Sequence, residues 1–144
     1  GHIVIDAEGE PCYCGRRGCV ETGLSGPALE NRYERLVGER LALAEILRRH
    51  RTGGNAHATT VVNTLCNEFG RALSMVVDVL DPDVIVLGGG VGQADELHKD
   101  GTFELKKHVF HEDPRLDVRR PSLGDSAGVF GAALLVRSSS WGRR

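Results

Sequence analysis

The sequence lacks a long apolar run, a strong net charge and a recognisable secretory signal. Its apolar stretches fall well short of the roughly 20 residues that cross a bilayer, so we expect no membrane span. A net charge of -2 provides no basic field that would attract nucleic acid. Without a secretory signal, nothing points to an oxidising compartment. We therefore expect a cytoplasmic protein that binds neither membranes nor, through this chain, nucleic acid.

The composition is that of a folded globular domain. Apolar residues make up 40% and charged residues 26% of the 144 positions, and a chain of this length can bury a substantial core. The chain begins at Gly1, inside a motif and without an initiator methionine, so we expect it to be a piece of something longer. The C-terminal residues 138–144 are polar, and we expect this tail to be mobile.

One histidine and three cysteines cluster near the start of the chain. His2 is followed, after a gap, by Cys12, Cys14 and Cys19 in the pattern C-x-C-x4-C. Three thiolates and one imidazole form the ligand set of a closed tetrahedral zinc site. We therefore expect residues 1–21 to form a zinc knuckle, in which glycines permit the positive φ angles of a chain folded tightly around an ion.

Disulfide bonds, free thiols and iron binding are the alternatives to zinc for these cysteines. Disulfides are disfavoured because Cys12 and Cys14 are too close for an easy mutual bridge, and Cys66 lies far away in a helical pattern. Iron also takes thiolate ligands, although one imidazole among three thiolates at this spacing favours zinc. The glycines expected to shape the knuckle are Gly15 and Gly18.

Apolar periodicity and turn residues predict alternating strands and helices. The predicted elements are a strand at 3–6, helices from Ser25 to Gly38, at 41–49 and at 56–80, a strand at 84–87 buried on both faces, a helix at 102–109, a strand at 116–118 and a helix at 126–136. Ser25 is the expected N-cap of the first helix, and Asp81 before Pro82 is the expected end of the longest. This order predicts an α/β fold with helices packed on a sheet.

Several reactive side chains are not expected to form functional sites. Cys66 lies on the apolar face of the long predicted helix, so we expect it in the core. His108 and His111 have helical spacing, but no carboxylate or thiolate completes a metal site, so we expect both on the surface. Arg16 and Arg17 are expected in a solvated loop.

Three ordered segments resemble the signature of one protein family. Residues 1–26 carry Gly-His, then Cys-x-Cys-Gly-x-x-Gly-Cys-x-Glu and Ser-Gly. Residues 81–90 read Asp-Pro-Asp-Val-Ile-Val-Leu-Gly-Gly-Gly, and residues 124–133 read Gly-Asp-Ser-Ala-Gly-Val-Phe-Gly-Ala-Ala. Together these segments resemble the ROK proteins, which comprise repressors, open reading frames and sugar kinases. The similarity covers nearly the whole chain and is greatest to the bacterial fructokinase and N-acetylglucosamine kinase branch.

The resemblance implies an actin-like, ribonuclease-H-like ATPase fold of two lobes, of which residues 1–137 would form the C-terminal lobe. This lobe would have a mixed sheet with packed helices and would comprise the zinc knuckle (1–21), a helical segment (25–80) and a glycine-rich nucleotide segment with a closing helix (83–136). In such kinases the N-terminal lobe carries the first phosphate-binding loop and the aspartate that acts as general base. No Asp-x-Gly-x-Thr loop occurs in this chain, so we expect no catalytic base here and no activity from the chain alone.

The resemblance also implies ligand-binding residues. Glu21 and His2 would bind the sugar, and His2 would use one ring nitrogen for a structural zinc ion and the other, protonated, for a sugar oxygen. Alternatively, Glu21 is an exposed side chain that the helix dipole favours at a helix start. Gly88, Gly89 and Gly90 would let backbone amides approach the nucleotide, although glycine runs also form turns without a ligand.

We therefore expect a kinase that uses ATP and Mg²⁺ to phosphorylate the 6-hydroxyl of fructose or a related hexose, and that forms a homodimer. The alternative is the sugar-binding lobe of a ROK-family transcriptional regulator, which would need a helix-turn-helix upstream. Glu21 and His2 fit both functions. The intact glycine run at 88–90 favours an enzyme that uses a nucleotide.

Overall fold

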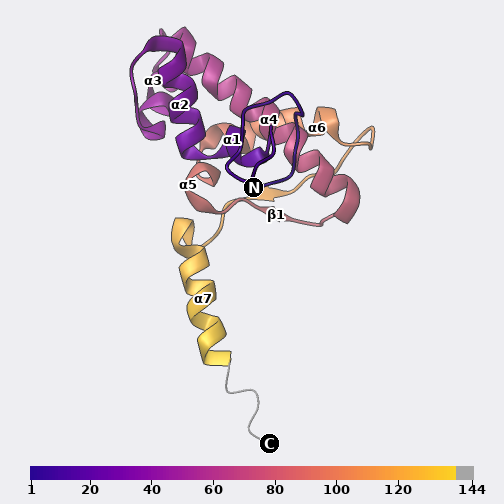
Figure 1. The fold of residues 1–144 in the computed structure, drawn as a ribbon. Helices are drawn as coiled ribbons and strands as arrows, with labels where there is room; N and C mark the ends of the chain where they lie inside the picture. The colour runs from indigo at the N-terminus through magenta and orange to yellow at the C-terminus, as the bar shows by residue number, and fades with distance from the viewer. Residues whose placement is uncertain (139–144) are drawn as a thin grey trace, which may run out of the picture.

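The structure is a computed structural model that describes residues 1–138 of the chain (Figure 1). Within this range it is rich in helices and contains a small sheet. In chain order the elements are α1 (Val20–Leu24), α2 (Gly26–Val37), α3 (Leu43–Thr52), α4 (Ala56–Leu80), β1 (Ile85–Val86), α5 (Gly89–Gly92), the π-helical turn η1 (Leu97–Gly101), α6 (Thr102–His108), β2 (Val118–Arg119), the 3₁₀ turn η2 (Gly124–Ser126) and α7 (Ala127–Ser138). Of the tail predicted to be mobile, residues 139–144 lie outside the described residues, and Ser138 ends α7.

Helix α4 forms the centre of the core and has the bounds predicted from its apolar period. It packs against α1, α2, α3 and, most extensively, α6. The buried core comprises Leu29, Tyr33, Ile46, Leu47, Ala58, Val61, Val62, Leu65, Cys66, Phe69, Ala94 and Leu97. The Asn55 side chain accepts a backbone N–H bond of 2.8 Å at the start of α4. Asp81 ends the helix with a φ of 42°, outside the right-handed α region, as expected before a proline.

The two helices before α4 follow their sequence signals closely. Helix α2 begins after Ser25, whose hydroxyl accepts the backbone N–H of Ala28, and it ends at Gly38 in the left-handed region. Both caps were predicted and are confirmed. Helix α3 was predicted at 41–49 and lies two to three residues further along, because Ala42 is extended and Gly53, with a φ of 73°, ends the helix.

The sheet is smaller and more exposed than predicted. Among the described residues β1 and β2 form a parallel pair, with Ile85 opposite Val118 and Val86 opposite Arg119. The expected mixed sheet is therefore wrong for this part of the chain. The burial of the 84–87 strand on both faces is also wrong, because Val84 and Val86 share one face and are 41% and 57% exposed. A parallel strand is buried on both faces only when a second layer covers its outer face, and here that face is open.

The strand predicted at 3–6 is also wrong. Val4 forms a single antiparallel bridge with Cys19, and the backbone N–H of Ile5 donates to the carbonyl of Gly18. The chain then turns at Asp6, whose carbonyl accepts the backbone N–H of Gly9. The β-branched residues pair with the returning knuckle at one position only, so no strand extends.

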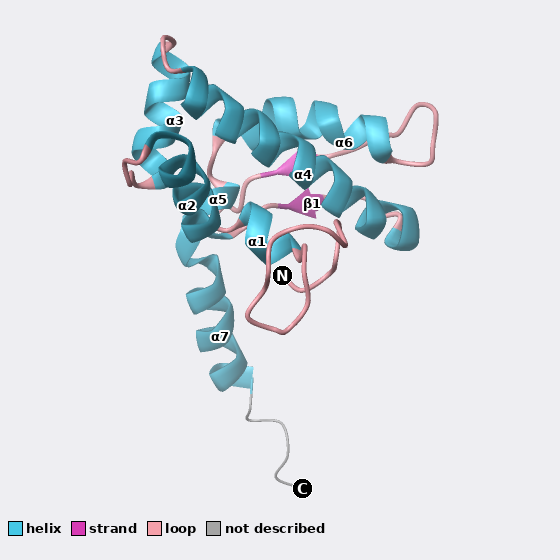
Figure 2. Cartoon of the chain, turned by 45° about the horizontal axis from the view of Figure 1, so that its top comes forward, coloured by secondary structure: helices cyan, strands magenta, loops and turns pink. Residues whose placement is uncertain are grey.

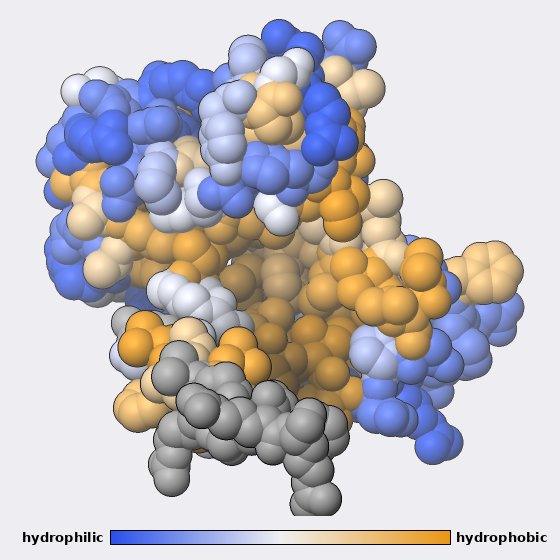
Figure 3. Space-filling model, turned by 60° about the horizontal axis from the view of Figure 1, so that its bottom comes forward, coloured by the Kyte–Doolittle hydropathy of each residue, from blue (hydrophilic) through white to orange (hydrophobic). Residues whose placement is uncertain are grey.

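Helix α7 was predicted at 126–136 and is confirmed in place, but it projects away from the body of the lobe (Figures 1 and 2). Val129, Phe130, Leu134 and Leu135 are each more than half exposed. Apolar surface gathers around a hollow on the side of the lobe from which α7 projects (Figure 3). A helix that is apolar all round belongs in a buried setting. Within residues 1–138, no helix combines the length and apolar character needed to cross a bilayer.

An ion pair inside the lobe links α3 to the segment just before η1. The Arg51 guanidinium donates to both carboxylate oxygens of Glu96, at 2.6 and 2.9 Å. The Glu96 side chain is 6% exposed and that of Arg51 is 47% exposed. Burial by itself raises the pKa of Glu96, but the hydrogen bonds and charge of Arg51 outweigh it and hold the pKa below its usual value.

We expect Arg51→Ala to lower the free energy of unfolding by about 1–3 kcal/mol at pH 7, because it leaves a buried carboxylate without its partner. Since the pKa of folded Glu96 is lowered, the pair contributes fully above the usual glutamate pKa of 4.5 and loses its contribution as the pH falls through the folded-state pKa. The difference in the free energy of unfolding between Arg51→Ala and the wild type should therefore become smaller as the pH is lowered. Urea titrations at several pH values measure this difference.

The matched control is Arg48→Ala on the same helix. Arg48 pairs with Glu45, and these side chains are 62% and 32% exposed. Because exposed ion pairs contribute little, Arg48→Ala should lower the free energy of unfolding by no more than about 1 kcal/mol. An equal decrease in the free energy of unfolding for the two variants would contradict the role assigned to the Arg51–Glu96 pair.

Candidate functional site

Residues 1–21 fold into a tight knuckle held by backbone hydrogen bonds. The N–H of Cys12 donates to the carbonyl of Arg16 at 2.8 Å, and the N–H of Gly15 donates back to Cys12 at 2.9 Å. Gly15 and Gly18 have φ angles of 87° and 60°, as predicted. A side chain at Gly18 would lie 1.5 Å from the carbonyl oxygen of Asp6, so only glycine fits there.

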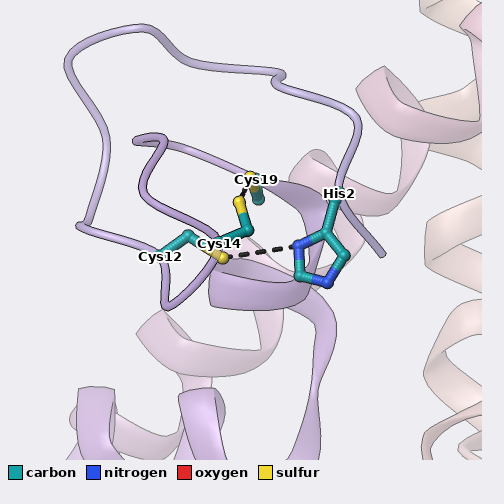
Figure 4. A group of neighbouring side chains, drawn as sticks. All are labelled: His2, Cys12, Cys14 and Cys19. Atoms are coloured by element: carbon teal, nitrogen blue, oxygen red, sulfur yellow. Dashed lines mark hydrogen bonds between the residues drawn. The ribbon is translucent and has the colours of Figure 1, made fainter.

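The knuckle brings together the four residues predicted to bind a metal (Figure 4). One ligand atom from each of His2, Cys12, Cys14 and Cys19 lies within 4.8 Å of the others. The sulfur atoms of Cys14 and Cys19 are 3.6 Å apart, and the Cys12 sulfur lies 3.5 Å from His2 Nδ1. Zinc bond lengths of about 2.3 Å to sulfur and 2.0 Å to nitrogen place tetrahedral ligand atoms about 3.6–3.8 Å apart. The donor set therefore fits a tetrahedral zinc ion.

All four cysteines of the chain are free thiols. The separation of 3.6 Å between the Cys14 and Cys19 sulfur atoms is far longer than the roughly 2.05 Å of a disulfide bond. Cys12 and Cys19 are buried, His2 is half-buried and Cys14 is exposed. The cluster thus opens to solvent on the Cys14 side.

The thiols of Cys14 and Cys19 have different electrostatic surroundings, which shift their pKa values in opposite directions. The backbone N–H of Arg16, followed by its guanidinium, donates to the Cys14 sulfur and lowers the pKa of Cys14 to about 6. Burial, followed by the neighbouring sulfur atoms, raises the pKa of Cys19 to about 11. Arg16 lies in an exposed loop, as predicted, and its interaction with Cys14 adds a role that the sequence did not reveal.

The second ring nitrogen of His2 has a protein partner that the sequence did not reveal. His2 Nδ1 faces the sulfur atoms, and Nε2 lies 2.9 Å from the hydroxyl of Tyr13. The two rings meet edge to face, with centroids 4.9 Å apart. A sugar oxygen that bonds to Nε2, as the resemblance implies, would therefore have to replace the Tyr13 hydroxyl. The only sequence signal for Tyr13 was its place between two cysteines of the predicted metal site.

Glu21 lies beside the segment that carries His2. Its backbone N–H donates to the carbonyl of Gly1 at 2.8 Å, and a side chain at position 1 would come within 2.7 Å of its carboxylate. It is half-buried in the first turn of α1. This position also fits the alternative that the helix dipole favours a carboxylate at a helix start. A neighbouring cavity of about 380 Å³ is lined by Glu21 and Tyr13, together with Asn31, but His2 does not line it.

The predicted nucleotide segment directly follows the small sheet. Gly88 precedes α5, and Gly89 has a φ of 77°. A Cβ atom added to Gly88, Gly89 or Gly90 would meet no atom within 4 Å, so a side chain at any of these positions would point into open space. The residues after it are fixed, because Arg120 donates to the carbonyl of Gln93 at 2.8 Å.

The burial of the three side chains that were not expected to form functional sites agrees with the prediction. Cys66 is 3% exposed in the core. His108 and His111 are exposed. All three expectations are confirmed.

The chain matches the ROK family over residues 1–139. It belongs to this family. The N-acetyl-D-glucosamine kinase of Mannheimia succiniciproducens is 36% identical over 124 residues, which cover 86% of this chain and 40% of that protein. The kinase of the same name from Pectobacterium carotovorum subsp. carotovorum is 34% identical over 135 residues, which cover 92% of this chain and 43% of that protein. The chain thus spans about two fifths of the length of these curated relatives.

Solved ROK structures share the fold. The ROK hexokinase of Thermus thermophilus matches with a TM-score of 0.81 and 28% identity, covering 96% of this chain and 48% of that chain. A ROK glucokinase from Streptomyces griseus, solved with glucose and AMPPNP, matches with a TM-score of 0.83 and 25% identity, covering 96% and 50%. A ROK transcriptional regulator, a homologue of the Escherichia coli MLC protein, matches with a TM-score of 0.69 and 26% identity, covering 82% and 33%.

These matches confirm the predicted family and the fold of its sugar kinases. The curated relatives described above are named for N-acetyl-D-glucosamine, and the glucokinase was solved with glucose. The expectation of fructose as the substrate gains no support from them.

We expect Arg16→Ala to raise the pKa of Cys14 from about 6 towards the ordinary thiol value of 9.0, without reaching it, because the backbone N–H at position 16 remains. In chelator-treated protein at pH 7, alkylation of Cys14 by iodoacetamide should slow several-fold, since the thiolate is the reactive form. Mass spectrometry of the labelled peptide across a pH series gives the rate and the pKa. Arg17→Ala, one residue along, should leave both unchanged. Identical pH profiles for wild type and Arg16→Ala would disprove the role of Arg16 in lowering the pKa of Cys14.

Proposed function

We propose that this chain is the C-terminal lobe of an ATP-dependent hexose kinase of the ROK family. The observation that carries the proposal is the fit of 96% of the chain to a ROK glucokinase solved with glucose and AMPPNP. The knuckle would then face the sugar, and the glycine run would face the nucleotide. The general base and the first phosphate-binding loop would lie outside this chain, in an N-terminal lobe.

We propose that the knuckle binds one structural zinc ion through His2, Cys12, Cys14 and Cys19. The short contacts of 3.5 and 3.6 Å between donor atoms support this assignment. Four protein ligands leave no open position for water, so the metal would supply rigidity and no Lewis-acid chemistry. That rigidity would fix the start of α1 and with it Glu21.

For the sugar, we propose that Glu21 accepts hydrogen bonds from hydroxyl groups. Its backbone bond to Gly1 and its place two residues after Cys19 support this role, because both hold the carboxylate against the knuckle. His2 is the second proposed sugar residue. A sugar that reaches His2 Nε2 must first replace the hydroxyl of Tyr13.

For the nucleotide, we propose that Gly88, Gly89 and Gly90 form part of the ATP site. Phosphoryl transfer depends on positioning and charge neutralisation, with Mg²⁺ bridging the phosphate oxygens. The open space around these glycines supports the role, because a ligand could approach the backbone without meeting side chains. The bond from Arg120 to Gln93 would hold the following residues in place.

The names of the relatives guide the choice of sugar. Curated relatives are N-acetyl-D-glucosamine kinases, and one structural neighbour is a glucokinase. We therefore propose glucose or N-acetylglucosamine as the substrate, phosphorylated on the 6-hydroxyl, in place of fructose. The homodimer that the resemblance implies and the cytoplasmic location that the composition suggests also stay proposals.

The second candidate function is the sugar-binding lobe of a transcriptional regulator, because a ROK regulator matches 82% of the chain at a TM-score of 0.69. The kinases match more of the chain with higher scores. The retained glycine run also favours a protein that uses a nucleotide. Phosphorylation of the sugar by the complete protein separates the two functions.

We expect the purified chain to contain about one zinc ion per molecule and Cys14→Ser to lose it, because the three remaining ligands no longer close the tetrahedron. The variant should also unfold at a lower temperature. Plasma mass spectrometry measures the metal and would reveal iron if iron were bound. Cys66→Ala, which removes a thiol outside the cluster, should keep its zinc. Wild-type chain that takes up no metal would refute the proposed site.

In the complete protein we expect Glu21→Gln to raise the KM for the sugar roughly ten- to a hundredfold, because charge-assisted hydrogen bonds are lost, while the KM for ATP changes little. Steady-state kinetics with each substrate varied measures both. Glu8→Gln, an exposed carboxylate of the same knuckle, serves as the control. Equal increases in both KM values would argue against a sugar contact. The chain alone should show no turnover, and measurable turnover would place the base within it.

A further inference from the structure

The aromatic ring of Tyr13 is directed at His2 although the core does not hold it there. Tyr13 is 83% exposed, so burial of its ring does not explain its orientation. Its hydroxyl lies 2.9 Å from His2 Nε2, and its ring meets the imidazole at an interplanar angle of 89°. A hydrogen bond and an edge-to-face ring contact therefore act on the same histidine.

The chemistry of His2 gives these contacts a purpose. Nδ1 faces the sulfur cluster, 3.5 Å from Cys12, so a metal bound there takes the lone pair of Nδ1 and leaves the proton on Nε2. That N–H needs an acceptor, and the oxygen of Tyr13 lies within hydrogen-bond distance. The acceptor behind a metal-bound histidine orients the ring and makes it a stronger ligand.

The chain itself sets Tyr13 in place. Its neighbours on both sides, Cys12 and Cys14, belong to the same donor cluster. Once both sulfur atoms are fixed, the backbone of Tyr13 is fixed between them. Residues 12–14 thus supply two sulfur donors and also the hydroxyl that contacts the third donor residue, His2.

We propose that Tyr13 is a positioning residue for His2 as a metal ligand. This role rests on the proposed metal site but goes beyond it, because no other observation assigns a function to Tyr13. The hydroxyl is the essential group, since it accepts the Nε2 proton. The ring contact is secondary.

The test compares zinc affinities of the wild-type chain, Tyr13→Phe and Arg17→Ala by competition with a chromophoric chelator. Tyr13→Phe keeps the ring and removes the hydroxyl, so we expect zinc to bind roughly ten- to a hundredfold more weakly. Arg17→Ala changes an exposed side chain of the same knuckle and should bind zinc as the wild type does. Because Tyr13 is exposed, the helix content by circular dichroism should be the same in all three.

A second measurement separates a hydrogen bond from a general loosening of the knuckle. In zinc-loaded protein labelled with ¹⁵N, the Nε2 proton of His2 should exchange slowly with water in the wild type and faster in Tyr13→Phe. Wild-type zinc affinity and proton exchange in Tyr13→Phe would overturn the role of Tyr13 while leaving the metal site intact. A wild-type chain that binds no zinc would overturn both proposals.

Discussion

Three sulfur atoms and one ring nitrogen within 4.8 Å of one another are the constraint on which the N-terminal part of the lobe depends. Before α1 the chain forms isolated backbone bridges, at Val4 and at Pro11, and its buried apolar side chains are those of Cys12 and Cys19. A segment with so little apolar core needs a cross-link to keep one shape. The surroundings of the thiols differ, because the backbone N–H and guanidinium of Arg16 lower the pKa of Cys14 and burial raises the pKa of Cys19. A bound cation would favour the thiolate form of both cysteines.

The knuckle is also joined to the core. Arg71, on the central helix α4, donates to the carbonyl of Ile5 at 2.6 Å, and α1 packs against α4. Glu21 lies in the first turn of α1, at the point where the knuckle becomes helix. A change in the donor cluster would therefore reach Glu21 and α4 through bonded and packed neighbours, without any large movement of the lobe.

The sequence predicted well what depends on nearby residues. The spacing of His2 and the three cysteines identified the donor cluster, and apolar periodicity with a pre-proline aspartate identified α4 with its bounds. It failed where the outcome depends on distant partners. The strand at 3–6 needed a partner that pairs for more than one residue, and the burial of Val86 needed a covering layer. Tyr13 was missed because an aromatic residue between two cysteines gains a role only from its side-chain direction.

Helix α7 has a consequence for the thermodynamics of the lobe. Its apolar side chains at Val129, Phe130, Leu134 and Leu135 meet mostly water. Covering them would contribute on the order of 1–2 kcal/mol each, together roughly 4–8 kcal/mol, which approaches the whole stability of an ordinary domain. An arm of this kind favours association with any surface that offers apolar contact. A neighbour that encloses it would thus gain much of its binding energy from one short terminal helix.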